Sequence, residues 1–181
     1  HVLALDVVLA DGEIVRLGSE GPEAPGFDLR GLVVGGEGTL GIVAGACVGL
    51  TPLGPVTHTM LFDFTSVEDS AGAVSRIIAD GVVPAALEMM DQGILVALED
   101  AFHFGFPLDA KAILLIEVDG LAAGLDAQRD RIVELCMQSG AREVRQAKDT
   151  EARLKLRKCR KQAFGAVGRL SPSYCTQDGA V

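Results

Sequence analysis

Seven glycines lie between residues 31 and 49, and this density constrains the fold of the chain more than any other feature. Because each glycine costs a helix about 1 kcal/mol relative to alanine, we expect no stable helix in this segment. A backbone without Cβ atoms can bring its N–H groups close to an anion or a flat cofactor ring. The spacing alone leaves two interpretations open, a cofactor contact or a glycine-rich turn.

The sequence around the glycines excludes two common phosphate-binding motifs. No Gly-Lys-Ser/Thr follows, as a P-loop requires, and a strand-like run follows instead of the helix of a Rossmann fingerprint. Upstream, the β-prone residues 2–9 and 13–17 flank Asp11-Gly12, which is a strong signal for an antiparallel hairpin. Residues 18–26 are predicted to form an irregular loop.

Residues 51–55, Thr-Pro-Leu-Gly-Pro, are the best candidate for a domain boundary, because two prolines and a glycine interrupt any regular element. Beyond this boundary the pattern predicts alternating strands, at 56–64, 84–90, 112–118 and 141–146, and helices, at 66–81, 91–102, 122–139 and 149–164. This alternation predicts an α+β fold with the helices stacked on one face of a sheet. The continuous apolar run at 112–118 suits a central strand that is covered on both faces.

Composition limits the class of protein. With 25 acidic and 16 basic residues the chain does not fit a nucleic-acid binder, which needs clustered Lys and Arg. No apolar run reaches the roughly 18 residues needed to cross a bilayer, so we expect no transmembrane segment. Cys47, Cys136, Cys159 and Cys175 show no zinc-site spacing, and scattered thiols favour a reducing cytoplasm.

The glycine-rich segment is also a motif. Residues 26–29 (GFDL) and 32–43 (LVVGGEGTLGIV) resemble the GYDL…LFVGSEGTLGI signature of FAD-linked oxidases of the vanillyl-alcohol-oxidase type, in the branch of glycolate oxidase and D-lactate dehydrogenases. In that family this segment runs beside the flavin, and its backbone contacts the cofactor. The resemblance therefore implies FAD as cofactor, held by eight residues of the motif, namely Gly35, Gly36, Glu37, Gly38, Thr39, Gly41, Ile42 and Val43.

The chain departs from the family pattern at several positions of this motif. Phe27 replaces the usual Tyr, Gly36 replaces Ser, and residues 44–46 (AGA) replace Thr-Glu-Ala. These exchanges remove polar side chains but no backbone contact.

The resemblance continues through residues 83–91 and 114–120 and into the tail. It implies that residues 1–54 are the C-terminal part of an FAD-binding domain. Residues 55–181 would be a truncated C-terminal cap domain, with a ferredoxin-like antiparallel sheet that binds the substrate.

Residues 157–166 (RKCRKQAFGA) resemble the family segment WKGRKxAFGA, and Arg160 stands where the family has its arginine. A guanidinium binds a carboxylate through two parallel hydrogen bonds, so we expect Arg160 to hold the carboxylate of a small 2-hydroxy acid. The alternative is that Arg160 is one charge on a solvated basic helix. Arg157 stands where the family has Trp, and Cys159 where it has Gly.

Other titratable residues are interpreted as structural. Asp91 is expected to cap a helix and Glu88 to be a polar strand residue, although two nearby carboxylates can also serve acid–base chemistry. His1, His58 and His103 share no ligand-like spacing, and we expect each to face solvent or to be satisfied by neighbours. By the resemblance, the catalytic and metal-binding histidines lie beyond residue 181, so no catalytic residue and no metal ligand is assigned here.

The resemblance implies oxidation of glycolate or D-lactate to the 2-oxo acid, with hydride transfer to the flavin. It also implies partner subunits for electron transfer, a cytoplasmic location or membrane association through those partners, and a chain that alone does not turn over substrate. The alternative from another class is a non-catalytic, ferredoxin-like interaction or regulatory module.

Overall fold

The computed structural model describes residues 1–21, 26–171 and 173–175, so part of the loop predicted at 18–26 lies outside the described residues. The chain divides into two compact units, His1–Leu53 and Gly54–Val181.

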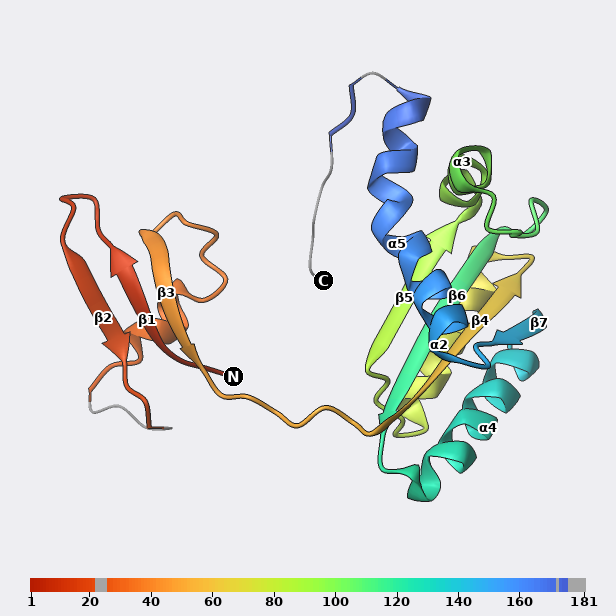
Figure 1. Ribbon diagram of the computed structural model, residues 1–181, viewed down its shortest axis with the longest axis horizontal. Helices are drawn as coiled ribbons and strands as arrows, with labels where there is room; N and C mark the ends of the chain where they lie inside the picture. The colour runs from red at the N-terminus through yellow and green to blue at the C-terminus, as the bar shows by residue number, and fades with distance from the viewer. Residues whose placement is uncertain (22–25, 172, 176–181) are drawn as a thin grey trace. The chain divides into compact units, whose positions relative to one another are not determined.

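The first unit is built on a three-stranded antiparallel sheet in the order β2-β1-β3 (Figure 1). The strands are β1 (Val2–Val8), β2 (Ile14–Gly18) and β3 (Ile42–Val48). The predicted hairpin between β1 and β2 is confirmed, and Gly12 supplies its turn with a φ of 87°. Asp11 supports the turn, because its carboxylate accepts a hydrogen bond from the N–H of Glu13 at 3.0 Å.

A five-residue helix, α1 (Leu29–Val33), precedes the glycine-rich loop. The prediction of no helix between residues 31 and 49 is therefore wrong for the first residues of that range. The reason is a local cap: the carboxylate of Asp28 accepts a hydrogen bond from the N–H of Gly31 at 3.0 Å and so satisfies a free donor of the first turn. After Val33 the segment is loop and then strand.

The second unit contains a four-stranded sheet in the order β5-β6-β4-β7, in which every neighbouring pair is antiparallel. The strands are β4 (Val56–Phe64), β5 (Ala86–Asp91), β6 (Ala112–Gly120) and β7 (Ala141–Gln146). In chain order the outer strands are the second and the fourth, which is the order of a ferredoxin-like β-α-β-β-α-β fold. The predicted α+β class with an antiparallel sheet is confirmed.

The helices of this unit are α2 (Val67–Ala79), α3 (Gln92–Phe102), α4 (Ala122–Gln138) and α5 (Thr150–Leu170). Short polar side chains begin three of them. Ser66, Asp91 and Asp149 each accept a hydrogen bond from a backbone N–H of the first turn of α2, α3 and α5 respectively. The caps predicted at Ser66 and Asp91 are therefore confirmed.

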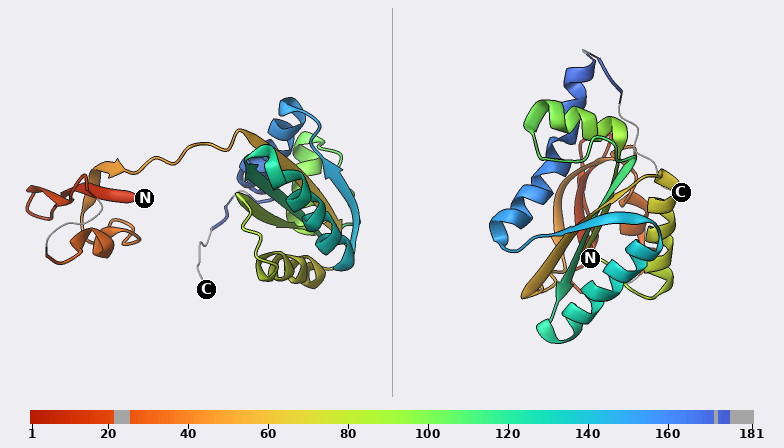
Figure 2. Two further views of the ribbon diagram at one scale, coloured as in Figure 1. Left: turned by 90° about the horizontal axis from the view of Figure 1, so that it is seen from below. Right: turned by 90° about the vertical axis from the view of Figure 1, so that its right-hand side faces the viewer.

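The helices cover both faces of this sheet, and the expectation of helices on one face only is corrected. On β4, Met60 and Phe62 pack in the core that includes α2 and α4, whereas Leu61 packs in the core that includes α3 and α5. Figure 2 (right) shows the two pairs of helices on opposite sides of the strands. The physical reason lies in β6, where the seven residues 112–118 are all buried and therefore need cover on both faces.

Candidate functional site

The glycine-rich loop of the first unit connects α1 to β3 and has an unusual backbone. Glu37 has a φ of 48°, and Gly35 and Gly38 have φ values of 85° and 79°. A non-glycine residue in the left-handed region carries strain, and such residues cluster at functional sites. The conformation at Glu37 is therefore the first structural sign of a site in this loop.

The hydrogen bonds of the loop leave several backbone donors free, among them those of the neighbouring residues Glu37 and Gly38. Gly36 donates to the carbonyl of Val33 at 2.9 Å, and both the N–H and the hydroxyl of Thr39 donate to the carbonyl of Gly36, at 2.9 and 2.6 Å. Within residues 26–171, the N–H groups of Glu37 and Gly38 donate to no protein acceptor. Both residues are exposed, so a ligand can reach these donors.

The glycines of the loop serve two different purposes. A Cβ at Gly41 would lie 2.6 Å from Cγ1 of Val7 and 2.9 Å from the carbonyl oxygen of Val8, so Gly41 is needed for packing against β1. A Cβ at Gly35 would meet nothing within 4 Å. Packing within the protein therefore explains Gly41, and the expectation that the motif contacts a cofactor stays a prediction.

Large apolar side chains surround the loop and remain exposed within the first unit. Five of them are about half exposed or more: Leu32 (64%), Val34 (51%), Leu40 (49%), Ile42 (69%) and Val43 (48%). The loop is therefore a surface with apolar and amide character, and it is not buried in the interior of its own unit.

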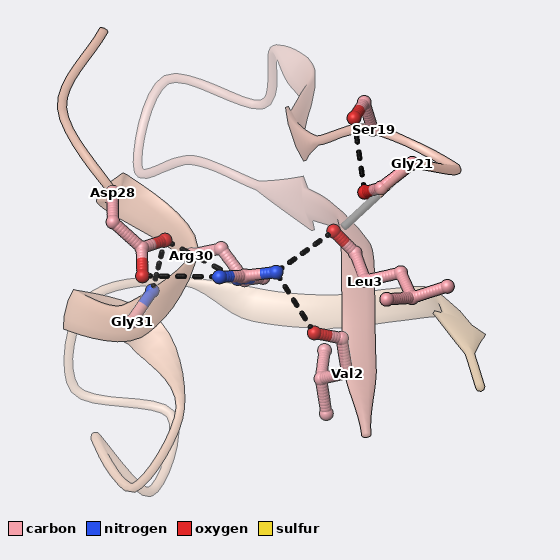
Figure 3. A network of polar contacts seen from close by, with 7 residues as sticks. All are labelled: Val2, Leu3, Ser19, Gly21, Asp28, Arg30 and Gly31. Atoms are coloured by element: carbon pink, nitrogen blue, oxygen red, sulfur yellow. Dashed lines mark hydrogen bonds and ion pairs between the residues drawn. The ribbon is translucent and has the colours of Figure 1, made fainter. Parts of the chain in front are cut away.

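Arg30 and Asp28 fix the base of this loop (Figure 3). The guanidinium of Arg30 donates to the carbonyls of Val2 and Leu3 at 3.0 and 3.4 Å, and it pairs with Asp28 at 3.1 Å. Hydrogen bonds from Arg30 and from the N–H of Gly31 lower the pKa of Asp28, so the carboxylate stays charged. Arg30 could not be identified from the sequence, because its carbonyl partners lie about 28 residues away, on β1.

In the second unit, Arg160 lies on α5, which crosses the sheet (Figure 1). Its Nε atom is 2.9 Å from Oε1 of Glu88 on β5, and the two side chains are 60% and 31% exposed. Among the described residues, Glu88 is the only ion-pair partner of Arg160. Because the Arg160 side chain is 60% exposed, a ligand can still reach the guanidinium.

A second arginine lies one turn earlier on the same helix. Nε of Arg157 is 3.4 Å from Oε2 of Glu117 on β6, and the hydroxyl of Thr59 donates to Oε1 of Glu117 at 2.6 Å. Glu117 is only 5% exposed, and these partners compensate for the loss of hydration of its buried side chain. One signal could have identified this group, since Glu117 interrupts an otherwise apolar strand.

The other candidate residues have structural roles or no shared site. Nε2 of His58 lies 3.1 Å from Asp126, and the exposed His103 ends α3 in the left-handed conformation. Among residues 1–21, 26–171 and 173–175, no group of three His, Cys, Asp or Glu side chains could hold a metal ion. In the same part of the chain, none of the helices is both long enough and apolar enough to cross a membrane.

Comparison with known proteins gives matches along the whole chain. Glycolate oxidase subunit GlcD of Escherichia coli strain K12 is 42% identical over 181 residues, which is 100% of this chain and 36% of that protein. A probable mitochondrial D-lactate dehydrogenase of Danio rerio is 30% identical over 176 residues, 95% of this chain and 35% of that protein. The chain thus spans about a third of the length of these relatives.

A solved structure, 4-ethylphenol oxidase from Gulosibacter chungangensis, has the same fold with a TM-score of 0.68. It is 20% identical, and the match covers 94% of this chain and 41% of that one. The family described as FAD linked oxidases, C-terminal domain, matches residues 54–181. Because this match covers more than half of the chain, the chain belongs to the FAD-linked oxidase family.

Proposed function

We propose that this chain provides one edge of the flavin site and the substrate-side domain of an FAD-dependent dehydrogenase or oxidase. The enzyme would oxidise a small 2-hydroxy acid, glycolate or D-lactate, to the 2-oxo acid. In this proposal residues 1–54 form the C-terminal part of the FAD-binding domain and residues 55–181 the cap domain. The similarity to GlcD along the whole chain supports the proposal, and the pair of free, exposed N–H groups at Glu37 and Gly38 carries it.

The loop has the features that a flavin would need. FAD, when bound, supplies the two-electron acceptor for the oxidation. The residues proposed to hold it are those of the motif, Gly35, Gly36, Glu37, Gly38, Thr39, Gly41, Ile42 and Val43. The free N–H groups would donate to polar atoms of the cofactor, and the exposed side chains of Ile42 and Val43 would cover apolar ring surface. Gly36, Thr39 and Gly41 would act indirectly, by giving the loop its shape.

Arg160 is proposed to hold the carboxylate of the substrate. Its exposed guanidinium can donate to one carboxylate, while the ion pair with Glu88 holds the guanidinium in place. The neighbouring Arg157, in place of the Trp of the family motif, adds a second cation close to the site. A hydrogen bond to a charged group contributes about 1.5–3 kcal/mol. Removal of Arg160 should therefore weaken the binding of a carboxylate substrate roughly 10- to 100-fold.

The test compares Arg160→Ala and Arg160→Lys with Lys158→Ala as a control on the same helix. In the flavin-loaded full-length enzyme that contains these residues, kcat/KM is measured for glycolate, D-lactate and a neutral alcohol with the same reacting group. We expect Arg160→Ala to lose 10- to 100-fold on the acids and little on the alcohol, with partial recovery in Arg160→Lys. An equal loss on acids and alcohol would show that Arg160 does not recognise the carboxylate.

The partners and location follow from the same proposal. GlcD is named as a subunit of glycolate oxidase. We propose, by analogy, partner subunits that accept the electrons and a cytoplasmic location, with or without membrane association through those partners.

A further inference from the structure

The second unit has a cleft of about 680 Å³ between its sheet and the beginning of α5. This volume lies within the range of small-molecule sites. The cleft is lined by residues before and at the start of β4, at the end of β7, in the connection to α5, in the first turn of α5 and at one position on α4. They are Pro55, Val56, Thr57, His58, Arg129, Val144, Gln146, Ala147, Lys148, Asp149, Thr150 and Arg153.

Among the charged residues of this lining, cations outnumber anions. Three of the lining residues are permanent cations, Arg129, Lys148 and Arg153, and one is acidic, Asp149. The carboxylate of Asp149 is engaged, because it accepts a hydrogen bond from the N–H of Ala152 at 2.7 Å as the cap of α5.

Arg129 and His58 are already compensated by acidic side chains outside the lining. Arg129 pairs with Asp126 at 2.7 Å and with Asp130 at 2.8 Å, and His58 lies 3.1 Å from the same Asp126. These two residues therefore leave little free positive charge for a ligand.

Lys148 and Arg153 are different, because their side chains have no hydrogen-bond or ion-pair partner within the described ranges. The Nε atom of Arg153 is buried and has no acceptor at all. Buried polar groups are almost always hydrogen-bonded in native proteins, so an unpaired guanidinium N–H indicates a missing acceptor. The N-terminal end of the long helix α5 carries the partial positive charge of the helix dipole and adds to the positive electrostatic potential at the same place. Glu151 in the first turn of α5 partly offsets it.

We propose that this cleft binds a small oxyanion, a carboxylate or phosphate group, through Arg153 and Lys148. The site is separate from Arg160. Seven residues of helix place Arg160 about 10 Å further along α5, where it pairs with Glu88 on β5, and neither residue lines the cleft. The inference does not depend on the proposed oxidation, because its residues take no part in the flavin or substrate contacts.

The test is a calorimetric titration of the 181-residue chain with inorganic phosphate and, separately, with malonate, at constant ionic strength. We expect saturable binding of at least one anion, and the stronger of the two identifies the ligand as a phosphate or as a carboxylate. Arg153→Ala and Lys148→Ala should each weaken this binding at least tenfold. Lys158→Ala, on the same helix but outside the cleft lining, should leave it unchanged.

A second variant separates binding from folding. Arg153→Met keeps the length of the side chain and removes the unpaired N–H, so it should fold with an unchanged or higher Tm and should not bind the anion. Absence of saturable binding for both anions overturns the proposal. An equal loss in Lys158→Ala also overturns it, because that result would mean attraction by diffuse positive charge.

Discussion

Substitution of Gly41 by alanine should unfold much of the first unit, whereas the same change at Gly35 should not. At Gly41, with φ 151°, the new Cβ would lie 2.6 Å from Cγ1 of Val7 and 2.9 Å from the carbonyl oxygen of Val8. Overpacking of this kind costs about 1–3 kcal/mol, and a positive φ at a residue with a Cβ costs about 1–2 kcal/mol more. A unit of this size has a free energy of unfolding of roughly 3–8 kcal/mol, so the sum removes a large part of it.

At Gly35 only the backbone strain applies, because a Cβ there meets nothing within 4 Å and φ is 85°. The expected cost is about 1–2 kcal/mol. Amide hydrogen exchange can follow the two units of one chain separately. In Gly41→Ala the amides of β1 and β3 should lose most of their protection while those of β6 keep it. In Gly35→Ala all three strands should stay protected. Similar protection of β1 and β3 in the two variants would refute the division of the glycines into packing and surface positions.

Two further predictions follow from burial and charge. Burial raises the pKa of Cys136 to about 12 and that of Cys159 to about 11. Neither thiol of the native chain should therefore react with iodoacetamide at pH 8. Mass spectrometry of the labelled peptides checks this. Labelling of either residue without unfolding would contradict the described core. The hydrogen bonds from Arg131 lower the pKa of Asp80 below 3.8. The stability that this pair contributes is therefore present above pH 3.8, and it is lost as the pH falls through the lowered pKa. Between pH 5 and pH 2 the Tm should therefore fall more steeply in the unaltered chain than in Asp80→Asn, and parallel curves would exclude this contribution.

Local features of the fold could be predicted from the sequence, because their causes lie within a few residues. The caps at Ser66 and Asp91 and the hairpin at Asp11-Gly12 depend on neighbouring backbone groups, and each was found as expected. The side of the sheet on which each helix packs was not predictable in this way. The amphipathic pattern of a helix shows that one side of the helix is buried, but it does not show against which face of the sheet that side packs.

The candidate sites were only partly predictable for the same reason. The pair of Arg160 with Glu88 and that of Arg157 with Glu117 join residues far apart in the sequence, and the path of α5 across the sheet brings them together. The glycine pattern indicated an irregular segment, and residues 34–41 form a loop, but the cofactor contact stays a prediction. The pattern could not separate Gly41, which packs against β1, from glycines that face open space.

The most direct test of the account is whether the flavin contacts the free N–H groups of the loop. In a ¹⁵N-labelled sample of this chain, the amide resonances of Glu37 and Gly38 are followed during titration with FAD, and ADP serves as the control for the adenine half of the cofactor. The account predicts that FAD shifts these two resonances more than ADP does, and more than it shifts the amides of β6. If both resonances stay in place at millimolar FAD while the first unit remains folded, the loop is not a flavin site, and the proposed function loses its main support.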